Sequence, residues 1–335
     1  MNSDQSRIHG VPTNIITGFL GVGKTSAILH LIQHKPSDER WAVLVNEFGE
    51  IGVDGSLFQG QHSEDQGVFI REVPGGCMCC AAGLPMQIAL NQLLAKAKPD
   101  RLLIEPTGLG HPKEVLQVLS TNYYQQILSL RKTLTLVDAR KLSDKRYTSN
   151  DTFNQQIAIA DTIIGNKLDL YQDEDKARLI AYVKQQGQPH TPVLFTKNGE
   201  VALSQLQGVT TSAPSHSHHH HNQNQQNKLL SAAPMPKCGV LRAMSERDGF
   251  HSVGWRFSPD KVFSRQKLFS FLNGLRVERM KASFITDTGN FGYNLTADAL
   301  TEIELNECLE SRIEMIANNH NVDSLEAQLL ACVIT

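Results

Sequence analysis

The stretch of sequence that decides the fold reads Gly18-Phe-Leu-Gly-Val-Gly-Lys-Thr25. It fits the pattern GxxxxGKT, follows the strand-like segment Asn14–Thr17 and precedes the helix-like segment Thr25–Gln33. In this context the backbone N–H groups of the loop and the N-terminus of the helix face the phosphates of a nucleotide. A glycine-rich turn without a ligand is the alternative, but such a turn does not require this spacing. The stretch therefore predicts a phosphate-binding loop for a nucleoside triphosphate.

Individual residues of this loop have separate predicted roles. Lys24 offers a positive charge to the β and γ phosphates and is a predicted catalytic residue. The hydroxyl of Thr25 is a predicted ligand of Mg²⁺. The nucleotide-binding residues expected here are Gly18, Gly21, Val22, Gly23, Lys24, Thr25 and Ser26.

A second motif, Asn166-Lys-Leu-Asp169, follows the apolar segment Thr162–Ile164. Asn166, Lys167 and Asp169 of this NKxD pattern are expected at the carboxyl edge of a parallel sheet, where ligands bind. The carboxylate of Asp169 can accept both N1–H and the exocyclic amine of guanine, a donor pair that adenine lacks. The motif therefore predicts GTP rather than ATP.

Two segments between these motifs are expected to sense the γ-phosphate. One is Asn46–Asp54, and the other is Glu105-Pro-Thr-Gly108. Glu105 is placed to hold Mg²⁺ through water or to orient the attacking water, and Gly108 to swing toward the γ-phosphate, so both are predicted catalytic residues. Glu47 is a further candidate metal ligand. The alternative is an acidic loop of solvated carboxylates and a helix cap.

Three of the six cysteines, Cys77, Cys79 and Cys80, lie within four positions. Thiolates bind Zn²⁺ well, and the metal keeps them deprotonated at neutral pH. The predicted zinc site has three sulfur ligands, whereas a closed structural zinc site has four. The fourth must come from a carboxylate, a histidine, water or another protein, and metal-dependent self-association stays open. A redox thiol cluster and inert buried cysteines are the alternatives.

A histidine run supplies a second, weaker metal feature. Neutral imidazoles on a polar tether would bind Zn²⁺ or Ni²⁺ weakly and release it quickly. A solvated polar linker without a function is the equal alternative. The accessory metal ligands expected here are His218, His219, His220 and His221.

Short apolar segments alternate with helix-like segments as far as Phe195, which predicts a doubly wound, mostly parallel α/β sheet of the P-loop GTPase type. The expected strands are Asn14–Thr17, Ala42–Asn46, Val68–Glu72, Leu102–Glu105, Leu134–Asp138, Thr162–Asn166 and Val193–Phe195.

The chain divides into three predicted parts. Residues 1–205 form the GTPase domain with the CxCC motif, and residues 206–237 form a His/Asn/Gln-rich flexible linker that lacks a core of its own. Residues 238–335 form a smaller α+β domain, with strands expected at Val253–Phe257 and Ala282–Asp287 and helices at Ser264–Leu272 and Ser324–Leu330.

The bulk composition excludes several classes of protein. With 335 residues, 40% of them hydrophobic, and a formal net charge of −2, the chain shows no sign of a nucleic-acid or membrane partner. No apolar run is long enough to span a bilayer. The polar residues at its start and the cysteine cluster predict a protein of the reducing cytoplasm.

Taken together, these motifs resemble the CobW-like, or metal-chaperone, branch of the P-loop GTPases. The resemblance is carried by Gly18–Thr25, Val43–Glu50, Pro74–Cys80, Leu102–Pro112 and Asn166–Asp169. It implies a slow GTPase that binds zinc at its CxCC motif. It also implies delivery of that zinc to client proteins, or a role in zinc homeostasis.

Three other functions remain open at this point. The first is a zinc storage or sensing module in which GTP hydrolysis is incidental. The second is a cobalt- or nickel-inserting GTPase, since thiolates alone do not select the metal. The third is an NTPase that uses the thiols for redox chemistry.

Overall fold

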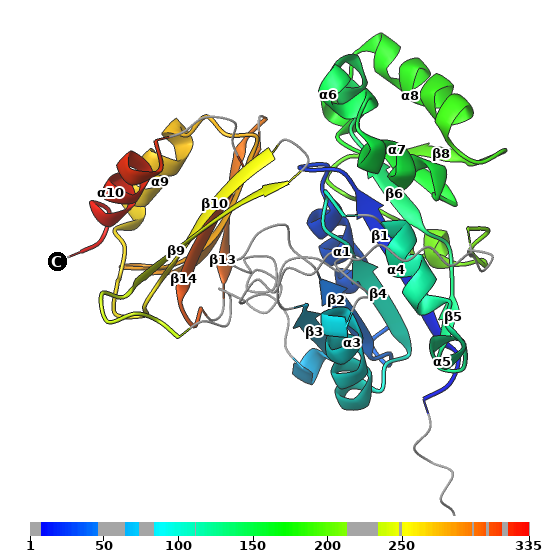
Figure 1. Cartoon of the computed structure of the whole chain (residues 1–335), viewed down its shortest axis with the longest axis horizontal. Coiled ribbons are helices and arrows are strands. Elements are labelled where there is room, and N and C mark those ends of the chain that lie inside the picture. The colour runs from blue at the N-terminus through cyan, green and yellow to red at the C-terminus, as the bar shows by residue number, and fades with distance from the viewer. Residues whose placement is uncertain are drawn as a thin grey trace, which may run out of the picture. The chain divides into compact units, whose positions relative to one another are not determined.

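The computed structural model describes residues 8–45, 64–73, 84–110, 112–212, 234–247, 250–296, 298–305, 308–316 and 321–334. The chain forms two compact units, shown in Figure 1. The described part of the first unit ends at residue 212, and that of the second begins at residue 234.

The first unit is built on a sheet whose described strands all run parallel, in the order β3-β2-β4-β1-β6-β7-β8, with β5 paired to β1. This confirms the predicted parallel α/β core. The strands are β1 (Val11–Gly18), β2 (Trp41–Val45), β3 (Val68–Glu72), β4 (Arg101–Glu105), β5 (Leu128–Leu130), β6 (Leu134–Val137), β7 (Thr162–Gly165) and β8 (Val193–Phe195).

Helices follow most of these strands (Figure 1). Every residue of β2 and β4 is buried, as expected for central strands covered on both faces. The helices are α1 (Lys24–Gln33), α3 (Leu84–Ala97), α4 (Pro112–Leu119), α5 (Asn122–Gln125), α6 (Lys145–Thr148), α7 (Asp151–Ala158) and α8 (Asp173–Gln186). Short 3-10 helices are η1 (Glu64–Gln66), η3 (Ala139–Ser143), η4 (Leu168–Leu170) and η5 (Leu203–Leu206).

The spacing of the apolar residues along α3 explains why this helix packs on the sheet. Met86, Leu90, Leu93 and Leu94 recur at helical spacing and are buried in one cluster with Leu44 of β2. Because parallel strands present their carboxyl ends at one edge, the segments that follow β1, β4 and β7 all leave the sheet at that edge. These are the segments in which the sequence places the nucleotide motifs.

The second unit is an antiparallel sheet in the order β13-β12-β11-β14-β10-β9, with α9 (Arg265–Gly274) and α10 (Val322–Leu330) on one face (Figure 1). It is the predicted small α+β domain. Trp255, Phe257 and Phe263 are fully buried in its core, whereas Phe269 is exposed on α9. The strands are β9 (Val240–Arg247), β10 (Phe250–Phe257), β11 (Arg279–Thr286), β12 (Gly289–Thr296), β13 (Leu300–Leu305) and β14 (Ser311–Ile316).

The last described segment of the first unit, residues 206–212, is held to the sheet by long-range hydrogen bonds. Asn14 Nδ2 donates to the carbonyl of Leu206 (3.0 Å), and Asp161 Oδ1 accepts from the main-chain N–H of Thr211 (2.8 Å). The linker expected at 206–237 thus starts within a packed segment, and its residues 213–233 lie outside the described part of the chain. None of the described helices combines the length and apolar character needed to cross a membrane.

Candidate functional site

The glycine-rich loop joins the end of β1 to α1 and lies against the NKxD motif. Gly23 has a φ of 96°, and a Cβ at this position would be 2.5 Å from Nδ2 of Asn166, so only glycine fits. The ammonium of Lys24 donates to the carbonyls of Gly18 (3.0 Å) and Phe19 (3.3 Å). The Lys24 side chain thereby lies across the loop, with its ammonium held by two main-chain carbonyls of that loop.

The hydroxyl of Thr25, at the start of α1, donates to Oε1 of Glu105 at 3.3 Å. The two residues meet because β1 and β4 are neighbouring parallel strands, with Ile15 opposite Ile104, and both chains leave at the same edge. Glu105 is buried at the end of β4. A hydroxyl and a carboxylate are hard oxygen donors of the kind that Mg²⁺ selects, so this pair fits the ion that accompanies nucleoside triphosphates.

The turn that follows β4 packs against the phosphate-binding loop. A Cβ on Gly108 would lie 3.0 Å from Cδ2 and 3.1 Å from the main-chain N of Leu20, so the two loops touch backbone to backbone. On its other side the turn is held by α7, where Nε2 of Gln156 donates to the carbonyls of Gly108 (2.9 Å) and Gly110 (3.5 Å). The predicted γ-phosphate sensor is therefore fixed from both sides in this structure.

The NKxD motif is also built into the loop. The buried side chain of Asn166 donates from Nδ2 to the carbonyl of Val22 (2.8 Å) and accepts the N–H of Gly199 at Oδ1 (3.0 Å). Lys167 has a left-handed backbone, with φ of 64°, and its ammonium lies 3.9 Å from Asp138 Oδ2. Asp169 is exposed on η4, where its carboxylate is accessible to a base.

Sequence reasoning missed the turn at Thr196–Gly199 after β8. The N–H of Gly199 donates to Asn166, and the carbonyl of Thr196 accepts the N–H of Leu168 at 3.0 Å. The turn therefore contacts the NKxD motif at two of its residues. The Asn198–Gly199 dipeptide is a turn signal at a strand end and was the available clue. Asp138 at the end of β6, which pairs with Lys167, was likewise overlooked as a site residue.

Several predicted metal ligands lie outside the described residues. Among the residues that the structure does describe, no group of three or more histidine, cysteine or acidic side chains is arranged to hold a metal ion. The ligands that remain sequence predictions are Cys77, Cys79, Cys80, Glu47, His218, His219, His220 and His221.

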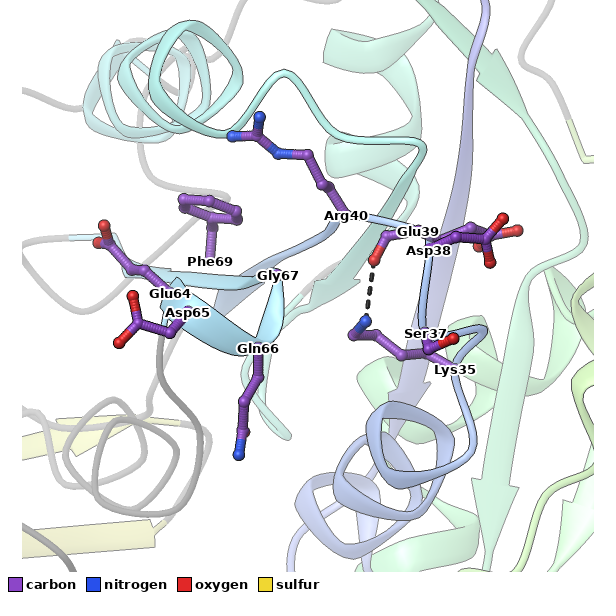
Figure 2. A pocket seen from close by; sticks show the side chains of 10 residues that line it. All are labelled: Lys35, Ser37, Asp38, Glu39, Arg40, Glu64, Asp65, Gln66, Gly67 and Phe69. Carbon is purple, nitrogen blue, oxygen red and sulfur yellow. Dashed lines mark hydrogen bonds between the residues drawn. The ribbon is translucent and has the colours of Figure 1, made fainter.

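A hollow of about 640 Å³ opens elsewhere in the first unit and is drawn in Figure 2. Its lining includes Arg40 and Gly67, the residues just before β2 and near the start of β3, so it lies at the amino edge of the parallel sheet, opposite the phosphate-binding loop. Lys35 in this hollow donates to the carbonyl of Glu39 at 2.8 Å, and the Arg40 guanidinium lies 4.9 Å from the ring centre of Phe69. No predicted nucleotide-binding residue lines it.

Comparison with known families agrees with the geometry at the carboxyl edge. Residues 12–195 match the family model described as the CobW/HypB/UreG nucleotide-binding domain. The chain belongs to the CobW/HypB/UreG family. The matched range contains the phosphate-binding loop, the turn at Gly108 and the NKxD motif, and it confirms the resemblance expected from those residues. Nucleotide binding is thus a property of this CobW/HypB/UreG chain.

Curated relatives cover the chain to different extents. The chain is 40% identical over 324 residues to the zinc chaperone YeiR of Escherichia coli K12. This alignment covers 95% of this chain and 97% of the relative. The chain is 31% identical over 172 residues to the zinc-regulated GTPase metalloprotein activator 1 of Schizosaccharomyces pombe, which spans 50% and 42% of the two chains. The crystal structure of Zn(II)-bound YjiA GTPase from E. coli aligns with a TM-score of 0.46 and 19% identity, covering 97% and 99%.

Proposed function

We propose that this CobW/HypB/UreG protein is a GTPase whose hydrolysis cycle drives the transfer of zinc to client proteins. The observation that carries the proposal is the contact of the Gly108 turn with the main chain of Leu20, beside the Thr25–Glu105 pair. A γ-phosphate bound at the phosphate-binding loop has to contact this turn. Loss of the γ-phosphate on hydrolysis therefore acts directly on the position of the chain that follows β4. The similarity to a zinc chaperone over 95% of the chain supports zinc as the metal that is transferred.

Each nucleotide motif has a part in this cycle. The loop residues Gly18 to Ser26 bind the phosphates, Lys24 adds its charge, and Thr25 with Glu105 would hold Mg²⁺, which neutralises charge on the phosphates when bound. Asn166, Lys167 and Asp169 hold the guanine base. As the alternative to a role at Mg²⁺, Glu105 orients the attacking water, and Gly108 senses the γ-phosphate.

The zinc ligands in this proposal are Cys77, Cys79 and Cys80. They follow β3, whose last residue Glu72 is opposite Val45, while Val45 is in turn opposite Glu105 of β4. The chain toward the cysteines therefore leaves the sheet two strand spacings, about 10 Å, from Glu105 and at the same edge. Nucleotide state can thus act on the geometry and zinc affinity of the thiolates over a short path.

Further parts of the proposal concern the surroundings of the protein. An incomplete thiolate set suits zinc that must leave again, so we expect a client protein with its own zinc site to complete the transfer. Free thiolates require a reducing compartment, so we place the protein in the cytoplasm. Zinc storage with incidental GTP hydrolysis is the second function to be tested, and cobalt or nickel is the alternative cargo.

Zinc affinity measured in two nucleotide states tests the coupling. With Mg²⁺ present, we expect zinc to bind with affinities at least tenfold apart in the complexes with GDP and with a non-hydrolysable GTP analogue. Substitution of Cys77, Cys79 and Cys80 by serine should abolish tight zinc binding and leave GTP affinity unchanged. Equal zinc affinity in the two complexes would remove the coupling and leave a storage protein.

A further inference from the structure

Gln156 of α7 is a buried side chain that none of the nucleotide motifs contains. Its side chain is 1% exposed, and its Nε2 donates to the carbonyls of Gly108 and Gly110. These two carbonyls also determine the orientation of the carboxamide, because the opposite orientation would direct its oxygen at them. The amide nitrogen of Gln156 therefore donates to the turn that is expected to sense the γ-phosphate.

The other end of the same carboxamide carries an unused acceptor. Oε1 of Gln156 is buried and has no hydrogen-bond partner among the described residues. A buried acceptor left unpaired costs free energy, so such atoms are rare in folded proteins. An acceptor beside this turn gains a partner when the turn presents an N–H to it in another arrangement.

The helix that carries Gln156 also contacts the phosphate-binding loop. Phe153, one turn earlier on α7, packs edge-to-face on Phe19 of the loop, with ring centres 5.7 Å apart. Residues three positions apart on a helix lie on the same face, so α7 contacts the phosphate-binding loop through Phe153 and the Gly108 turn through Gln156. The main chain of Gln156 is itself anchored, because its carbonyl accepts the hydroxyl of Thr135 of β6 at 2.8 Å.

We propose that Gln156 is a positioning residue that holds the Gly108–Gly110 turn in two arrangements. Without a γ-phosphate, Nε2 donates to the carbonyls of the turn, as described above. When the turn rotates toward a γ-phosphate, one of its N–H groups donates to Oε1 instead. The side chain thus offers a partner to either orientation of the peptide, which keeps the energy difference between the two arrangements small. This inference rests on the proposed GTPase function and adds a residue to it.

A variant of similar length without hydrogen-bonding groups tests the role of the carboxamide. In Gln156→Met both arrangements lose a partner, but a buried N–H without an acceptor is tolerated less well than a carbonyl without a donor. We therefore expect kcat for Mg²⁺-GTP hydrolysis to fall about tenfold, which corresponds to about one hydrogen bond. The KM for GTP should stay within about twofold, because the residues that bind phosphates and base do not contact Gln156. A parallel loss of kcat and of folded protein would contradict a positioning role.

Thr135→Val is the matched control for general damage to α7. It removes the hydrogen bond to the main-chain carbonyl of Gln156 and leaves the carboxamide in place. We expect it to lower the melting temperature about as much as Gln156→Met while kcat stays within twofold of wild type. Equal kcat losses in the two variants would overturn the proposal.

NMR of glycine amides in the full chain provides a readout that does not depend on turnover. With ¹⁵N-glycine labelling, the amide signals of Gly108 and Gly110 should differ between the Mg²⁺-GDP complex and the complex with a non-hydrolysable GTP analogue. The N–H of Gly110 already donates to the carbonyl of Thr107 at 3.0 Å. The Gly108 amide should therefore be the one that is protected from hydrogen exchange only with the analogue, and Gln156→Met should remove that protection. Identical protection in both complexes of the wild type overturns the inference. If wild-type protein shows the change but no GTP hydrolysis, the proposed function fails and the role of Gln156 stands.

Discussion

The main-chain N–H of Gly199 donates to Oδ1 of Asn166 at 3.0 Å, and this bond joins the turn after β8 to the NKxD motif. Nδ2 of the same asparagine donates to the carbonyl of Val22, 144 residues earlier in the chain. A single buried side chain therefore connects the phosphate-binding loop, the NKxD motif and the turn at Thr196–Gly199.

Replacing Asn166 by alanine tests this connection. Two buried main-chain groups, the carbonyl of Val22 and the N–H of Gly199, lose their partner. We expect a loss of about 2–6 kcal/mol in the free energy of unfolding, since each of the two buried unpaired groups costs about 1–3 kcal/mol. Urea denaturation of the nucleotide-free protein measures it. A loss under about 0.5 kcal/mol would show that the three segments are held together by other contacts.

Asp169→Asn changes the predicted selectivity for guanine. The amide presents a donor where the guanine amine donates, so affinity for GTP should fall on the order of a hundredfold, the range expected for hydrogen bonds to a charged group. Affinity for xanthosine triphosphate, which has an oxygen at that position, should rise. Because Asp169 is exposed, the melting temperature should not change. Competition binding with fluorescent GTP measures both affinities, and equal binding of ATP and GTP by the wild type would contradict the assignment.

Gly108→Ala adds a methyl group where the turn meets the phosphate-binding loop. The new Cβ would lie 3.0–3.2 Å from atoms of Leu20 and Phe19, including main-chain atoms, so one of the loops has to move. We expect a loss of about 1–2 kcal/mol in stability, typical of overpacking, and a fall of about tenfold in GTP turnover.

Gly274→Ala is the control for that substitution, because a Cβ at Gly274 at the end of α9 meets no atom within 4 Å. It should leave turnover unchanged and stability within about 0.5 kcal/mol of wild type. If Gly108→Ala behaves like Gly274→Ala in both measurements, the contact between Gly108 and Leu20 contributes to neither stability nor GTP turnover.

Acid should destabilise the second unit through Glu302. The hydrogen bond from Arg265, at 2.5 Å, holds the pKa of Glu302 below its ordinary value. A carboxyl with a lowered pKa in the folded state stabilises the fold above its ordinary pKa, and that contribution is lost as the pH falls below the ordinary value of 4.5. Glu302→Gln should therefore flatten the decline in stability below pH 4.5, by about 0.5–1 kcal/mol for this partly exposed pair.

The two tryptophans make this measurement specific to one unit. Trp41 is buried in the first unit and Trp255 in the second. In a Trp41→Phe background, fluorescence of the full chain reports on Trp255 alone during urea unfolding at pH 3.5 to 7. A pH dependence unaffected by Glu302→Gln would show that other carboxylates control acid stability.

The sequence by itself determined the parallel α/β core, the phosphate-binding loop, the NKxD motif and the family. These features are local: Gly18–Thr25 and Asn166–Asp169 have diagnostic spacing, and buried strands such as β2 consist of consecutive apolar residues. The three-residue strand β5 was missed, because so short a segment has no periodicity to detect.

Only the tertiary structure decided which residues support those motifs. Gln156 is 48 residues from Gly108 in the chain, and Gly199 is 33 residues from Asn166. Glutamine on a helix and glycine in a turn are common, so the sequence alone does not show which distant residue either of them contacts. They acquire a role because folding brings distant main-chain groups into the interior, where each donor and acceptor needs a partner.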